Sequence, residues 1–207
     1  MPRGRLITIE GIDGAGKTTL AGSLHAALRE RGTDVELLRE PGGVALSERI
    51  RALVKDPRIE IGDRAEALLY AASRAQLVGE RVEPLLGGGR WVLLDRYVDS
   101  SLAYQGGGRA LGVDAVAAIN AFATGGLRAD RTLLVSIEPS AGRARIADRG
   151  ETPDRLERER DAFFAATAAA YAALAEAEPA RIRVLDATLE PALVLGAALA
   201  ALEDLLV

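Results

Sequence analysis

The chain has 207 residues, enough for one large α/β domain, and its formal net charge is −4. The negative charge argues against a protein that coats nucleic acid, because such a protein normally presents a basic face. With no cysteine and a single histidine, the sequence excludes disulfides, thiolate metal sites and histidine zinc clusters.

The apolar stretches are too short for membrane or export segments. The first, residues 6–9, is broken by Glu10, which is unlike a signal peptide. The longest, residues 191–202, cannot span a bilayer. We therefore expect a cytoplasmic protein.

Apolar runs of β type alternate along the chain with helical patterns. The expected strands are residues 6–10, 35–39, 91–95, 131–137 and 182–185. The expected helices are residues 18–31, 47–54, 63–86 and 140–149, a stretch marked by Phe163, Thr167, Tyr171 and Leu174, and a C-terminal segment that begins at Pro191. Among the helix ends, Ser47 is a candidate N-cap, Asp63 and Glu66 resemble a capping box, and Gly32 is a candidate C-terminal cap.

Continuous apolar strands separated by helices predict a parallel sheet that is covered on both faces. The expected fold is a three-layer α/β/α sandwich with a five-stranded parallel sheet. No linker or shift in composition divides the sequence, so we expect residues 1–207 to form a single domain. Ligands of such folds bind at the carboxyl ends of the strands.

Residues 11–18 fit the pattern G-x-x-x-x-G-K-[ST] of a P-loop, between an expected strand and an expected helix. The glycines let backbone N–H groups point at phosphate oxygens, and the helix N-terminus adds partial positive charge. Lys17 is expected to reach the β- and γ-phosphates of a nucleotide. The predicted phosphate cradle consists of Gly11, Ile12, Asp13, Gly14, Ala15, Gly16, Lys17 and Thr18.

Two oxygen ligands for Mg²⁺ are predicted near this cradle. The Thr18 hydroxyl occupies the P-loop position that binds the metal. Asp95 ends an apolar strand, where P-loop proteins carry a carboxylate that faces the metal.

The remaining sequence narrows the class of P-loop protein. GTP-binding switches recognise guanine with an Asn-Lys-x-Asp motif, but the only asparagine is Asn120, which is followed by Ala121. A small-molecule kinase fits better, because it needs cations between donor and acceptor phosphates. Arginines suited to this task are Arg39, Arg96, Arg109, Arg143, Arg145, Arg149 and Arg155. The last four surround Gly150 and Pro153, which predicts a lid at about residues 143–157.

At this point the motifs resemble those of bacterial thymidylate kinases. The similar segments are IEGIDGAGKTT at residues 9–19, REPGG at 39–43, LYAASRAQL at 69–77, DRYVDSSLAYQGGGR at 95–109, and RGE…DRLE at 149–157. The P-loop is common to many kinases, whereas residues 95–109 are the specific part. The resemblance implies transfer of a phosphoryl group from ATP to dTMP with Mg²⁺, and a homodimer.

The resemblance also implies roles for residues of the acceptor pocket. Arg96 would clamp the acceptor phosphate, which suits a guanidinium fork. Tyr70 would lie against thymine, Arg74 would donate to a base carbonyl, and Ser101 and Gln105 would bond the base edge. Tyr104 would fill the space of a ribose 2′-hydroxyl. Asp13 would lie near the sugar 3′-hydroxyl, and Arg51 and Glu40 would line the pocket.

The catalytic cations are expected to be Lys17, Arg96 and two arginines of the lid. Some members of the family have an arginine inside the P-loop, where this chain has Ile12, Asp13 and Ala15. The lid is therefore expected to supply the missing cation, first through Arg149 and then through Arg145.

Two other functions are compatible with the sequence. Another deoxynucleoside or nucleoside monophosphate kinase would keep the P-loop but change Tyr70, Arg74, Ser101 and Gln105. A non-catalytic nucleotide-binding protein would keep the cradle without turnover, although intact Lys17, Thr18, Asp95 and Arg96 argue against it.

Overall fold

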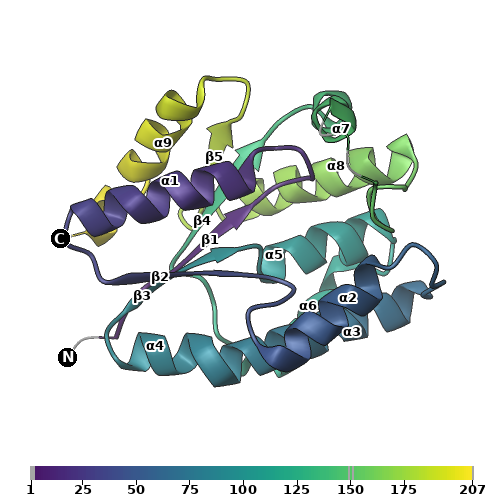
Figure 1. Ribbon diagram of the computed structural model, residues 1–207, viewed down its shortest axis with the longest axis horizontal. Coiled ribbons are helices and arrows are strands. Elements are labelled where there is room, and N and C mark those ends of the chain that lie inside the picture. The colour runs from purple at the N-terminus through teal and green to yellow at the C-terminus, as the bar shows by residue number, and fades with distance from the viewer. Residues whose placement is uncertain (1–2, 149, 151, 207) are drawn as a thin grey trace.

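Five parallel strands form one sheet in the order β2-β3-β1-β4-β5 (Figure 1). The computed structural model describes residues 3–148, 150 and 152–206. The strands are β1 (Leu6–Glu10), β2 (Val35–Arg39), β3 (Trp91–Asp95), β4 (Arg131–Ser136) and β5 (Ile182–Asp186). Each lies within one residue of its predicted bounds.

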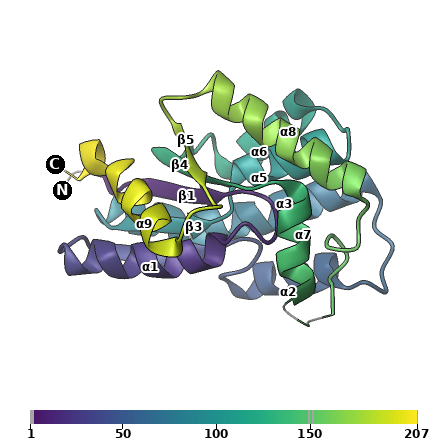
Figure 2. The same ribbon diagram turned by 90° about the horizontal axis from the view of Figure 1, so that it is seen from above.

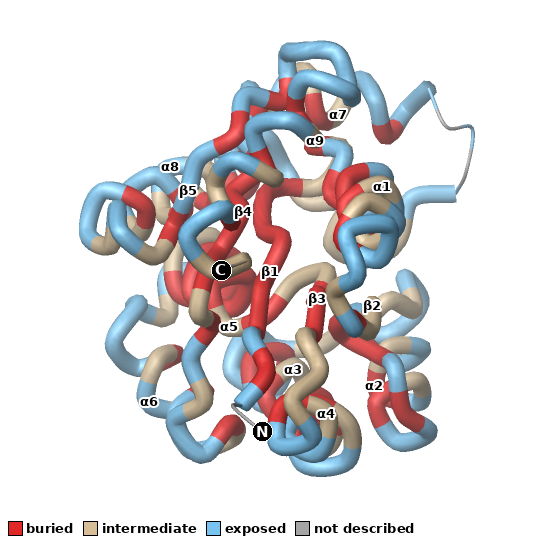
Figure 3. The backbone as a smooth tube through the Cα atoms, turned by 90° about the vertical axis from the view of Figure 1, so that its left-hand side faces the viewer, coloured by how far each residue is buried: buried red, intermediate tan, exposed pale blue. Residues whose placement is uncertain are grey.

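Helices cover both faces of the sheet. On one face lie α1 (Lys17–Glu30) and α9 (Pro191–Ala200), which contact each other (Figure 2). On the other lie α4 (Glu83–Gly87), α5 (Val98–Ser101) and α8 (Asp161–Ala177). Between the layers, the central strands β1, β3 and β4 are mostly buried (Figure 3). The remaining helices are α2 (Ala45–Lys55), α3 (Asp63–Leu77), α6 (Val113–Thr124) and α7 (Pro139–Asp148). The three-layer prediction is confirmed.

The predicted helix at 63–86 is continuous but changes its winding. After α3 the chain takes π-helical turns in η1 (Val78–Val82) before α4. The predicted capping box is wrong, because the N-cap is Gly62 and no side chain caps this end. Glu66 is instead fully buried.

Of the two other predicted helix caps, Gly32 is confirmed and Ser47 is wrong. Gly32 follows α1 with φ 84°, as expected of a left-handed cap. Ser47 is no N-cap, because α2 begins at Ala45 and the buried Ser47 hydroxyl donates to the Ser73 carbonyl at 2.7 Å.

The segment after β3 is helical, which the sequence left undecided. A π-helix, η2 (Leu102–Gly108), follows α5 directly and packs against α8. A side chain at Gly108 would stand 2.6 Å from the Thr167 hydroxyl and 2.7 Å from the Phe163 ring. A side chain at Gly107 would stand 2.5 Å from Ala170 Cβ, so Gly107 and Gly108 lie where η2 and α8 approach too closely for a larger residue.

The C-terminus closes with a short 3₁₀ turn, η3 (Glu203–Leu205). Among the residues that the structure describes, no helix combines the length and hydropathy of a membrane span.

Candidate functional site

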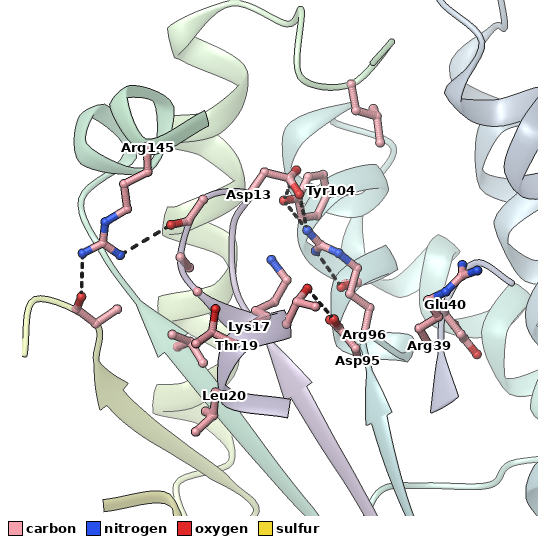
Figure 4. Close-up of a pocket in the computed structure, with 18 of the residues that line it drawn as sticks. Asp13, Lys17, Thr19, Leu20, Arg39, Glu40, Asp95, Arg96, Tyr104 and Arg145 are labelled. Atoms are coloured by element: carbon pink, nitrogen blue, oxygen red, sulfur yellow. Dashed lines mark hydrogen bonds and ion pairs between the residues drawn. The ribbon is translucent and has the colours of Figure 1, made fainter. Parts of the chain in front are cut away.

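A cavity of about 850 Å³ lies at the carboxyl ends of the strands (Figure 4). One part is bounded by the loop between β1 and α1, and the other by β2, α3 and η2. The nine side chains expected around an acceptor nucleotide all line it, namely Asp13, Glu40, Arg51, Tyr70, Arg74, Arg96, Ser101, Tyr104 and Gln105. Residues 13–18 of the phosphate cradle line it as well, whereas Gly11 and Ile12 do not.

The conformation of the phosphate cradle requires glycine at three positions. Gly11, Gly14 and Gly16 have φ of 141°, 78° and 98°. A side chain at Gly14 would stand 2.1 Å from the carbonyl oxygen of Gly142 on α7. The close approach brings α7 beside the P-loop.

Lys17 is a buried cation at the centre of this cradle. It is 6% exposed, and its Nζ donates to the Ile12 carbonyl at 2.7 Å. Burial, followed by repulsion from Arg96, lowers the pKa of Lys17 to about 8. A bound anion would favour the charged form of Lys17 and so raise this pKa again, which means that the surroundings of Lys17 fit a phosphate group.

The predicted metal ligands are neighbours. The Thr18 hydroxyl donates to Asp95 Oδ2 at 3.0 Å, across the carboxyl ends of adjacent strands. A hydroxyl and a carboxylate are the hard oxygen donors that Mg²⁺ prefers. Within the described residues no cluster of three His, Cys, Asp or Glu side chains could hold a metal. These two residues therefore fit Mg²⁺ that takes its other ligands from phosphates and water.

Arg96 lies between the P-loop and the part of the cavity that β2, α3 and η2 bound. It has φ 71°, a left-handed conformation that is strained outside glycine. Its guanidinium donates to the Gly11 carbonyl at 3.1 Å, to Ser100 Oγ at 3.2 Å and to Asp13 Oδ1 at 2.5 Å (Figure 4). Its Cζ also lies 5.0 Å from the centre of the Tyr104 ring. Such strain at a ligand cavity is typical of a functional residue.

Asp13 and Tyr104 form a pair beside Arg96. The Tyr104 hydroxyl donates to Asp13 Oδ2 at 2.8 Å. Burial alone would raise the pKa of Asp13, but the charges of Arg96 and Lys17 outweigh it and hold that pKa well below its usual range. Asp13 is thus an ionised acceptor, which suits a contact with a sugar hydroxyl.

Arg74 is engaged by the protein more fully than its predicted contact with a base suggests. It is 1% exposed and donates to Glu40 Oε2 at 2.7 Å, Ser101 Oγ at 2.9 Å and the Tyr97 carbonyl at 2.8 Å, and also to Asn120. A base carbonyl would have to share one of these donors. The contact between Arg74 and a base stays a prediction.

Glu40 has one oxygen without a partner. Its Oε1 is buried and accepts no hydrogen bond from the described residues. Burial raises the pKa of Glu40 to about 7, although Arg74 opposes the shift. Glu40 therefore has an acceptor to offer in the pocket beyond its bond to Arg74.

Comparison with known proteins assigns the family. The family model described as thymidylate kinase matches residues 9–196. The chain belongs to the thymidylate kinase family. It is 46% identical to "Thymidylate kinase" of Halorhodospira halophila, over 89% of this chain and 87% of that protein. It is 50% identical to the proteins of the same name from Oenococcus oeni, over 92% and 91%, and Deinococcus radiodurans, over 91% and 91%.

Of the two lid arginines expected to act in catalysis, the structure describes Arg145. Arg145 donates to the Ala187 carbonyl at 3.0 Å and to the Gly14 carbonyl at 3.5 Å, and it lines the cavity. Arg149 lies outside the described residues. Arg143 instead pairs with Asp161, and its Cζ lies 5.6 Å from the Phe164 ring centre.

The sequence motifs did not identify Glu10, a carboxylate that acts on Arg96 through Ser100. Glu10 is fully buried; it accepts from Ser100 Oγ at 2.5 Å, Tyr171 OH at 2.9 Å and the Tyr97 backbone at 2.7 Å. Ser100 also accepts from Arg96, so Glu10 helps to orient that guanidinium. The signal was a charged residue in a strand of otherwise uncharged, buried residues.

Proposed function

We propose that this chain transfers the γ-phosphoryl group of ATP to dTMP and forms ADP and dTDP, with Mg²⁺ as cofactor. The observation that carries the proposal is one cavity that joins a P-loop to all nine expected acceptor residues. Lys17 and Arg96 stand where these two parts meet (Figure 4). The names of the relatives support the same activity.

On the donor side, the P-loop amides and Lys17 would bind the β- and γ-phosphates of ATP. Thr18 and Asp95 would hold Mg²⁺, which neutralises charge that develops on the phosphates. The turn after β5 also lines the cavity through Ala187 and Thr188 and would face the adenine. Arg145 on α7 would approach the transferring group from the opposite side to Arg96.

On the acceptor side, Arg96 would bind the phosphate of dTMP and align one of its oxygens with the γ-phosphorus. This oxygen is already anionic at neutral pH, so in-line transfer needs no general base. Positioning and charge compensation then account for catalysis. Tyr104, 4% exposed and bonded to Asp13, would leave no room for a 2′-hydroxyl.

A panel of acceptors tests this proposal directly. With ATP and Mg²⁺, we expect kcat/KM to be highest for dTMP in a set that also contains dUMP, dCMP, dGMP, AMP and thymidine. Turnover of thymidine or of another monophosphate in preference to dTMP would overturn the acceptor assignment and keep the kinase class. Binding of ATP without turnover of any acceptor would identify a non-catalytic nucleotide-binding protein.

The homodimer is the second part of the proposal. Each of three helices carries an exposed apolar side chain: Leu46 on α2, Leu68 on α3 and Phe122 on α6 are 48%, 55% and 93% exposed, and α3 contacts both of the other helices. A second copy of the chain would bury them. The lid at residues 143–157 and the cytoplasmic location stay predictions.

Sedimentation equilibrium checks the dimer. We expect twice the chain mass for the wild type and one chain mass for the double variant Leu68→Asp and Phe122→Asp. Leu193→Asp is the matched control, because Leu193 is 60% exposed on α9, away from these helices. A wild-type protein of one chain mass, or a double variant that stays dimeric, would contradict this assembly.

A further inference from the structure

Glu66 on α3 is a carboxylate enclosed by donors. It is 0% exposed, and it takes no part in the mechanism described above. Its Oε1 accepts from Gln105 Nε2 at 2.8 Å and from Arg109 Nε at 3.3 Å. Its Oε2 accepts from Arg109 Nη2 at 3.0 Å and from Arg155 Nη2 at 2.5 Å.

Its hydrogen-bond donors keep the Glu66 carboxylate ionised. Burial alone would raise the pKa of Glu66, but the hydrogen bonds from Arg109 and Gln105 outweigh it and hold that pKa below its ordinary value. An ionised carboxylate accepts hydrogen bonds and donates none. The neighbouring amide of Gln105 must therefore turn its NH₂ group toward Glu66.

This orientation decides which atom of Gln105 remains for a ligand. An amide has one donor end and one acceptor end, and here the donor end is occupied by Glu66. In the described part of the chain, no group donates to Gln105 Oε1. Gln105 is 2% exposed and lines the cavity. The atom of Gln105 that remains for a ligand in the pocket is therefore its carbonyl oxygen, which is a hydrogen-bond acceptor.

Ser101 is oriented in the opposite sense. Its Oγ accepts from Arg74 Nη1 at 2.9 Å, which leaves the hydroxyl proton free to be donated. Ser101 is one helical turn before Gln105 and lines the same cavity. The pocket therefore offers one acceptor beside one donor.

We propose that Glu66 sets the base specificity of the acceptor pocket by fixing the amide of Gln105 with its carbonyl oxygen toward the ligand. This inference rests on the proposed function. A base with an N–H next to a carbonyl, as in thymine and uracil, complements the pair formed by Gln105 and Ser101. Cytosine offers a lone pair at N3 and an NH₂ group beside it, so it meets acceptor with acceptor and donor with donor.

The substitution Glu66→Gln reverses this arrangement. The carbonyl oxygen of the new amide is held by the two Nη2 groups of Arg109 and Arg155, because charged donors form the stronger bonds. Its NH₂ group then faces Gln105, which must turn its own carbonyl oxygen inward and its NH₂ group toward the ligand. Glu66 acts through Gln105 and is a positioning residue.

The test compares kcat/KM for dTMP, dUMP and dCMP in the wild type and in Glu66→Gln. We expect the values for dTMP and dUMP to fall together by about tenfold or more, and the ratio of dTMP to dCMP to fall by at least the same factor. The affinity for ATP is expected to stay within about twofold. A purely structural role would reduce all three acceptors alike and leave the ratio unchanged.

Two variants serve as comparisons. Glu66→Asp keeps a group that only accepts, so the ratio of dTMP to dCMP is expected to persist even where rates fall. Glu80→Gln alters a carboxylate that also accepts from a glutamine amide, Gln76 Nε2 at 2.9 Å, but on the surface. It is expected to change nothing. Loss of the ratio in Glu66→Asp, or its persistence in Glu66→Gln, would overturn the inference.

A measurement on the wild type covers the case in which the variants fail to fold. In ¹³C,¹⁵N-labelled protein, a scalar coupling across the hydrogen bond between Gln105 Nε2 and the Glu66 carboxylate is expected with and without dTMP. Its absence in the dTMP complex would overturn the inference. If the wild type shows no preference for dTMP, the proposed function fails; if that preference survives in Glu66→Gln, only the role of Glu66 fails.

Discussion

Replacing Lys17 with methionine is expected to lower kcat for dTMP phosphorylation by about 10³-fold, the range found when one positioned electrostatic group is removed. The Lys17 ammonium is the cation in the cradle itself, and a neutral water molecule in its place would not supply the positive charge. Methionine keeps most of the chain length, so the loss is one of charge. Binding of dTMP is expected to survive, because the residues proposed to hold it do not bond to Lys17.

Steady-state kinetics and calorimetric titration with dTMP check this result. Arg29→Met is the matched control, since it removes one positive charge from the exposed last turn of the same helix. We expect that variant to behave as the wild type. A Lys17→Met enzyme with kcat within tenfold of the wild type would mean that the phosphates are bound elsewhere in the cavity.

The sheet and the phosphate cradle were predictable because their sequence signals are local. Five short apolar runs between helical patterns determine a parallel sheet, and residues 11–18 combine a motif with its structural context. The π-helical turns of η2 were not predictable. They depend on the contact of Gly107 and Gly108 with α8, which lies more than fifty residues later in the chain.

The candidate site shows the same division. The side chains that meet in the cavity could be named from motifs, but their hydrogen-bond partners could not. Glu66 has the sequence pattern of a helix cap, yet its partners are Gln105 in η2, Arg109 directly after η2, and Arg155 in the segment after α7. Arg74 likewise fits a motif, while the structure shows that its guanidinium donates to partners from three separate segments of the chain. Partners that are distant in sequence decide the protonation and orientation of buried polar groups.

Replacing Arg96 with methionine is expected to lower kcat/KM for dTMP by about 10³-fold or more, with both kcat and KM affected. The guanidinium is proposed to bind the acceptor phosphate, and it also neutralises Asp13 at 2.5 Å. Without it, Asp13 would be a buried carboxylate left to Lys17 and Tyr104, and repulsion between Asp13 and the phosphate of dTMP would be uncompensated. Arg90→Met is the control, because Arg90 lies at the opposite end of β3 in an exposed pair with Asp34.

A second substitution separates the charge of Arg96 from its backbone. With φ 71°, residue 96 is strained for any side chain but not for glycine. Arg96→Gly should therefore be as inactive as Arg96→Met but more stable to unfolding by about 1 kcal/mol, which urea titration measures. Equal stability would show that the surroundings impose no strain on residue 96. Activity retained in either variant would remove Arg96 from the acceptor site and leave its strained backbone without a catalytic reason.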